Sequence, residues 1–161
     1  MREIVTSIEH EYRRYKKLAE GAFDQVTDAE LVESPSREGN SLAVLVWHLS
    51  GNLKSRFTEF LTSDGEKPWR DRESEFVSRT VTRADLRAKW EEGWVILFRT
   101  LSELNDEALS RRVTIRGVEL SVLEALHRSL AHASYHVGQV VLLAKSFRGE
   151  SWRSLSIPRG R

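Results

Sequence analysis

Histidine side chains are the groups of this sequence best suited to chemistry. The stretch HRSLAHASYHVGQ, residues 127–139, holds three of the five histidines, and His132 and His136 lie four residues apart. On a helix, residues four apart have Cβ atoms about 5–6 Å from each other, so both imidazole rings can reach one metal ion. Because zinc–nitrogen bonds are about 2.0–2.1 Å long, a third ligand has to come from another element. We expect that ligand to be His48, in the apolar run SLAVLVWHLSGN.

A helical projection separates these three histidines from the other two. With a step of about 100° per residue, His132 and His136 fall side by side on one flank of an apolar stripe. His48 likewise lies beside the apolar stripe of its own helix. His127 projects to the far side of its helix, and His10 projects away from the apolar stripe of the first helix, so both are expected to be solvated.

Two interpretations of the three histidines remain open on spacing alone. A single histidine beside a core is more often a structural side chain than a ligand, and a lone HxxxH pair is a weak motif. Three histidines beside the apolar stripes of two helices, however, would each need a polar partner. One shared metal ion satisfies all three acceptor nitrogens.

The elements that must position these histidines are four long amphipathic helices. The apolar spacing predicts helices over residues 2–22, 41–61, 82–104 and 121–146. Capping boxes are expected at Thr27–Glu30 and Ser121–Glu124, and a helix cap is expected at Thr82–Asp85. The segment SDGEKPWRDRES, 63–74, is expected to be non-helical because Gly65 and Pro68 interrupt it, and VTIRGVEL, 113–120, suggests a small hairpin. The fold class is therefore predicted to be all-α, a four-helix bundle in a single domain spanning 1–161, with a long loop between the second and third helices.

The amino-acid composition excludes several classes of protein function. Lys plus Arg number 25 against 24 for Asp plus Glu, a net charge of +1, which argues against a nucleic-acid binder. The chain has no cysteine, so any metal must be held by histidine or oxygen ligands. The N-terminus lacks the apolar region of a secretory signal, and no run approaches the roughly 18 apolar residues of a membrane span. We expect a soluble cytoplasmic protein.

Three stretches resemble the DinB/YfiT-like superfamily of metal-dependent enzymes, in an uncharacterised branch with HxxxHVGQ and LSIPxG motifs. They are SLAVLVWHLSGNLKSRFTEFLTSDGEKPW, HRSLAHASYHVGQVVLLAK and SWRSLSIPRG, which together touch most of the chain from about residue 40 to 160. The resemblance implies a four-helix bundle with an up-down-down-up course, often a homodimer. It also implies a divalent metal ion, typically nickel or zinc, bound by His48, His132 and His136. The family motif commonly has Asn where this chain has His127, which we do not count as a ligand.

A site of this kind is open to substrate. Three neutral histidines leave at least one position of the ion free, whereas structural zinc is usually closed by four protein ligands. Water bound there can have its pKa lowered to about 7, and an incoming thiol would be deprotonated. Because several relatives are thiol S-transferases, the resemblance implies a transferase of a low-molecular-weight thiol, or a hydrolase, acting on a small molecule. No general base can be assigned. The alternative is a non-enzymatic dimeric stress or interaction module whose histidines bind metal structurally or not at all.

Five further side chains are expected near the site. Asn52, Arg56 and Glu59 share the side of the helix that carries His48, so they are expected to support a ligand or contact substrate; a solvated polar edge is the alternative for Arg56 and Glu59. Gln139 follows His136 by three residues and either fixes an imidazole or faces a neighbouring chain. Trp69 either covers the site or packs its loop onto the helices.

The tail WRSLSIPRG, residues 152–160, mixes apolar and basic groups. It is expected to pack over the end of the helices. Binding of an anionic substrate by Ser154, Ser156 and Arg159 is the alternative.

Overall fold

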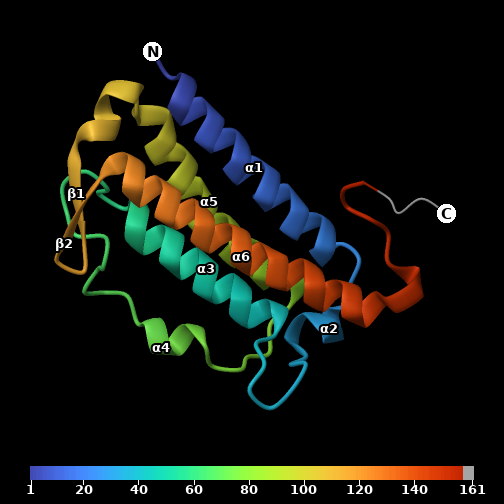
Figure 1. Cartoon of the computed structure of the whole chain (residues 1–161). Helices are drawn as coiled ribbons and strands as arrows, with labels where there is room; N and C mark the ends of the chain where they lie inside the picture. Colours follow the sequence, from blue (N-terminus) through green and yellow to red (C-terminus); the bar gives the residue numbers. More distant parts are fainter. Residues whose placement is uncertain (158–161) are drawn as a thin grey trace.

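The computed structural model describes residues 1–157 and is mostly helical (Figure 1). Within those residues lie six α-helices: α1 (Glu3–Phe23), α2 (Asp28–Val32), α3 (Leu42–Phe57), α4 (Arg72–Glu75), α5 (Arg83–Glu103) and α6 (Val122–Arg148). Strands β1 (Arg112–Ile115) and β2 (Val118–Ser121) form an antiparallel two-stranded sheet directly before α6. Short 3₁₀ turns span Asp106–Ser110 and Gly149–Ser151.

The four long helices pack against one another around an apolar core. Figure 1 shows α1 and α6 running in one direction and α3 and α5 in the opposite direction. Helix α3 contacts both α5 and α6, and α1 contacts α6 and α5. Gly93 permits the close approach of α3 and α5, because a Cβ there would lie 2.8 Å from the backbone oxygen of Ser50. Aromatic rings fill the space between α1 and α5, where Tyr12 and Trp94 meet edge to face at 6.2 Å.

The predicted helix caps are confirmed at all three positions. Thr27, Thr82 and Ser121 each accept a hydrogen bond from the backbone N–H three residues on, and each N3 carboxylate accepts from the cap's own N–H. Such caps satisfy backbone donors that have no partner inside the helix, so they set the first residue of the helix.

Two of the predicted element boundaries were wrong. The helix over 41–61 ends at Phe57, because Thr58 is extended and Glu59 has a φ of 49°. The segment 63–74 is not entirely non-helical, because α4 begins at Arg72. Asp71 caps α4 through its Oδ1, which accepts from Ser74 N at 3.1 Å, and Gly65 and Pro68 lie before that cap.

The predicted hairpin is confirmed, and it holds the long loop between α3 and α5. Arg116 and Gly117 form its turn with φ values of 53° and 74°, as a two-residue type I′ turn requires. The carboxylate of Asp64 accepts from the backbone N–H groups of both turn residues at 2.9 Å. Gly65 N donates to Thr114 O at 2.7 Å. The loop after α3 is thereby fixed against the hairpin, beside the start of α6.

No helix among residues 1–157 is long and apolar enough to cross a membrane.

Candidate metal centre

The three histidines chosen from the sequence lie together in the structure. His48 comes from α3, and His132 and His136 come from α6. One ring nitrogen from each lies within 4.8 Å of the other two, a grouping that could hold a metal ion. His48 and His136 are buried, with 5% and 6% exposure, and His132 is partly buried. His127 and His10 are exposed, as the helical projection predicted.

The ring of His48 is oriented by a buried carboxylate. Its Nδ1 lies 2.9 Å from Glu75 Oε2, so Nδ1–H donates to the carboxylate and Nε2 keeps its lone pair. Arg70 holds Glu75 from the other side, donating from Nε and Nη2 at 2.8 and 2.9 Å. Helix α3 carries Gly51 at the point of contact, where a Cβ would lie 2.8 Å from Glu75 Cδ. Glycine therefore leaves the space that the carboxylate occupies.

The ring of His136 is held in a similar way by a residue of its own helix. Its Nδ1 lies 2.7 Å from Gln139 Oε1, so Nδ1–H donates to the amide oxygen and Nε2 is left as an acceptor. This hydrogen bond is compatible with the imidazole-fixing role considered for Gln139 from the sequence. Among the described residues, the buried His136 Nε2 has no hydrogen-bond partner.

The remaining nitrogens of the cluster are also consistent with a shared cation. His48 Nε2 and His132 Nε2 are 3.2 Å apart. Two nitrogens bound to one tetrahedral zinc at about 2.0–2.1 Å are about 3.3 Å from each other. Within residues 1–157, His132 Nδ1 is a second buried nitrogen without a hydrogen-bond partner. Unpaired buried nitrogens are rare in folded proteins. The unpartnered His136 Nε2 and the close pair of Nε2 atoms from His48 and His132 fit the acceptor set that a divalent ion needs, whereas His132 cannot bind the same ion through both of its ring nitrogens.

Burial keeps the α6 histidines neutral. It lowers the pKa of His132 to about 3, with further lowering from the nearby charges of His136 and His48. Burial also lowers the pKa of His136 to about 4, although the hydrogen bond to Gln139 acts in the opposite direction. Burial raises the pKa of Glu75, but the hydrogen bonds from Arg70 and His48 outweigh it and lower that pKa overall. At neutral pH the site therefore has two neutral imidazoles and an ionised carboxylate.

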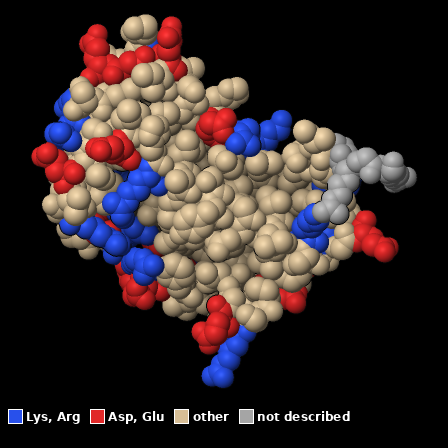
Figure 2. Space-filling view, viewed as in Figure 1, with Lys and Arg blue, Asp and Glu red and all other residues tan. Residues whose placement is uncertain are grey.

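A cavity of about 200 Å³ opens beside the histidines. His48 and His132 line it, and so do Asn52 and Arg56, two of the side chains expected there. Glu59 is not brought to the cavity: it lies exposed beyond the end of α3. Trp69 does not line the cavity either: it is 53% exposed, and the centroid of its ring lies 5.8 Å from Lys54 Nζ. Figure 2 shows Lys and Arg side chains gathered on the part of the surface that holds the hairpin and the start of α6.

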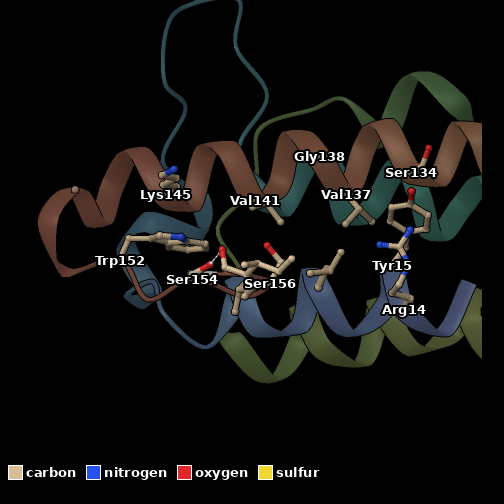
Figure 3. A pocket seen from close by; sticks show the side chains of 14 residues that line it. Arg14, Tyr15, Ser134, Val137, Gly138, Val141, Lys145, Trp152, Ser154 and Ser156 are labelled. Atoms are coloured by element: carbon tan, nitrogen blue, oxygen red, sulfur yellow. Dashed lines mark hydrogen bonds between the residues drawn. The ribbon is translucent and has the colours of Figure 1, made fainter. Parts of the chain in front are cut away.

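A larger pocket lies elsewhere, between α1, α6 and the tail that follows α6 (Figure 3). Its volume is about 760 Å³, and none of the three clustered histidines lines it. Trp152, Ser154 and Ser156 line this pocket, so the described part of the tail packs onto the helices as expected. Arg159 and the end of the LSIPxG motif lie outside the described residues.

Sequence reasoning missed Glu75, Arg70 and Gly51. Carboxylates commonly orient ligating histidines, but the chain has 24 acidic residues and Glu75 is 27 positions from His48. Gly51 offers a weak signal, since a glycine inside a helix marks a place where something approaches the backbone closely.

Comparisons with known proteins relate the chain to an uncharacterised group. A family model described as "Protein of unknown function (DUF1572)" matches residues 1–161. Among curated proteins, none matches the chain. The crystal structure of a conserved protein from Enterococcus faecalis is similar, with a TM-score of 0.67 at 19% identity over 93% of this chain and 99% of that one. That likeness concerns the fold alone.

Proposed function

The chain belongs to the DUF1572 family of proteins of unknown function, and for this member we propose a metal-dependent enzyme. Its divalent ion, nickel or zinc, would be held by His48, His132 and His136. Its reaction would be the transfer of a low-molecular-weight thiol to a small molecule, or the hydrolysis of a small molecule.

The observation that carries the proposal is the arrangement of ring nitrogens. Glu75 and Gln139 engage the Nδ1 atoms of His48 and His136, which leaves both Nε2 atoms as acceptors. Buried histidines that served only the core would each have their own polar partner. In this cluster His136 Nε2 and His132 Nδ1 have none among the described residues. A shared cation supplies the missing partner of His136 Nε2.

The surrounding residues would prepare the site for chemistry. A divalent ion held there supplies Lewis-acid activation of an incoming thiol or water. Glu75 fixes the ring of His48 and places negative charge behind it, which raises the basicity of a ligating imidazole. The centroid of the Phe76 ring lies 4.6 Å from that of His48, so an apolar ring packs beside the imidazole.

The proposal includes a DinB-like four-helix bundle with an up-down-down-up course, and a homodimer. Helices α1 and α6 run opposite to α3 and α5, which supports the proposed course of the bundle (Figure 1). The homodimer is proposed from the resemblance to the DinB/YfiT-like superfamily. Light scattering coupled to size-exclusion chromatography tests it.

The enzymatic proposal is tested by comparing three proteins incubated with the same divalent metal ion: wild type, a variant with His48, His132 and His136 all changed to Ala, and a His127→Ala control. We expect wild type and His127→Ala to transfer a low-molecular-weight thiol to small electrophiles, or to hydrolyse small esters or amides. The triple variant should be folded by circular dichroism and inactive. If wild type binds metal but shows neither activity across broad panels, and the triple variant loses only stability, the protein is instead a non-enzymatic module.

A further inference from the structure

The cavity beside the histidines is lined by an unusual concentration of positive charge. Five arginines line it, and no Asp or Glu does so among the described residues. They come from three parts of the chain: α3, the loop and short helix that follow it, and the hairpin with the start of α6. The five are Arg56, Arg70, Arg72, Arg116 and Arg128.

Carboxylates behind the cavity wall neutralise only part of this charge. Glu66 Oε2 lies 3.2 Å from Arg56 and 2.7 Å from Arg116, so one carboxylate serves two guanidinium groups. Arg70 is paired with Glu75.

Arg72 is paired with Glu73 at the surface. Arg128 has no ion pair with any residue in 1–157. Three carboxylates, Glu66, Glu73 and Glu75, form ion pairs with these five arginines, so the ion pairs leave two of the five positive charges unmatched, 5 − 3 = 2.

One of these arginines is buried with a donor unused. The side chain of Arg70 is only 2% exposed. Its Nη1 has no hydrogen-bond partner among the described residues, and the nearby Glu66 Oε1 is 3.8 Å away, beyond hydrogen-bond distance. A buried guanidinium donor without an acceptor is costly, so its presence in a cavity wall points to an acceptor brought by a ligand.

We propose that the substrate carries a compact anionic group, a carboxylate or a phosphate, that binds in this cavity between Arg70, Arg116 and Arg128. This inference rests on the proposed function, because it places the reacting part of the substrate at the histidines that line the same cavity. The volume of about 200 Å³ is below the roughly 300–1,000 Å³ of a typical small-molecule site, which suits a head group whose remainder extends over the rim. Planar guanidinium donors match both carboxylate and phosphate oxygens.

Isothermal titration calorimetry at low ionic strength tests the inference on metal-free and zinc-loaded full-length protein. The probes are inorganic phosphate and succinate, with the neutral diamide of succinate as the uncharged control. The informative variant is Arg128→Gln, because Arg128 is exposed and its loss leaves no buried partner unpaired. Arg99→Gln is the matched control, an exposed arginine on α5 that does not line the cavity. Metal content is measured separately on every sample.

We expect metal-free wild type to bind phosphate or succinate but not the diamide, and the stronger of the two anions identifies the head group. Arg128→Gln should weaken binding about three- to tenfold, the loss of one charge-assisted hydrogen bond at a partly solvated site, and Arg99→Gln should not. If the anion binds only to zinc-loaded protein, and binds equally well to Arg128→Gln, the anion is a ligand of the metal and the inference is overturned. Absence of binding in both forms would overturn it too. Anion binding without any metal uptake would instead sink the proposed function and leave the arginine site standing.

Discussion

Position 51 should need a glycine only because the side chain of Glu75 packs against it. The effect of Gly51→Ala on the free energy of unfolding should therefore reverse sign when Glu75 is removed. A Cβ on residue 51 would overlap Glu75 Oε1 and lie 2.8 Å from Cδ, well inside the roughly 3.5–4.0 Å of ordinary carbon contacts. The end of a glutamate is normally free to move away. This one accepts hydrogen bonds from Arg70 and from His48, so moving it breaks at least one of them.

The expected magnitudes follow from two opposing effects. Loss of one charge-assisted hydrogen bond costs about 1.5–3 kcal/mol, while Gly→Ala within a helix stabilises by about 0.8–1 kcal/mol. Gly51→Ala should therefore lower the free energy of unfolding of the wild-type chain by about 0.5–2 kcal/mol. In a Glu75→Ala background the clash is absent, and the same substitution should raise that free energy by about 0.5–1 kcal/mol.

Urea unfolding of the four metal-free proteins measures both effects: wild type, each single variant and the double variant. The two effects of Gly51→Ala should differ by about 1.5–3 kcal/mol between the backgrounds. A substitution that is equally harmful with and without Glu75 would show that the carboxylate is not held against α3, and the account of how His48 is oriented would be wrong.

Two further predictions concern the α6 histidines. Metal-free protein should lose stability as pH falls below about 6.5, because unfolded histidines take up protons there while folding holds the pKa of His132 at about 3 and of His136 at about 4. The loss should level off below those values, and a variant with both residues changed to Ala should show a flatter profile in urea unfolding at pH 7 and pH 5. Gln139→Ala should weaken metal binding about tenfold, because it frees the His136 ring; competition with a chromophoric chelator measures this. Ser146→Ala, on the same helix, is the control, and equal affinities in the two variants would contradict the role of Gln139.

The helices and the three histidines were predictable because both depend on local regularities. Ser121 and Glu124 cap α6 within a span of four residues, so the motif is visible in the sequence itself. Helical periodicity likewise fixes which side chains share a face, and it placed His132 and His136 together and His127 away from them. The convergence of His48 with that pair then needs only that α3 and α6 pack along their apolar stripes.

The residues that orient and surround the histidines were not predictable because they depend on long-range contacts. Glu75 follows a loop that Asp64 holds against the hairpin turn, more than 50 positions away, and no local pattern in the sequence shows that this loop returns to His48. The end of α3 was misplaced for a related reason. The apolar pattern continues through Phe60, which is buried in the turn and not in the helix. Trp69 was expected to pack or to cover the site, yet it is half exposed beside Lys54.

Metal content is the most direct test of the central claim. Plasma mass spectrometry on tag-free protein should find about one nickel or zinc ion per chain in wild type. Because His132 belongs to the cluster and His127 is exposed on the same helix, His132→Ala should lose the ion and His127→Ala should retain it. Wild-type protein that contains no metal and takes none up on reconstitution, or a His132→Ala variant that binds as much metal as His127→Ala, would contradict the account.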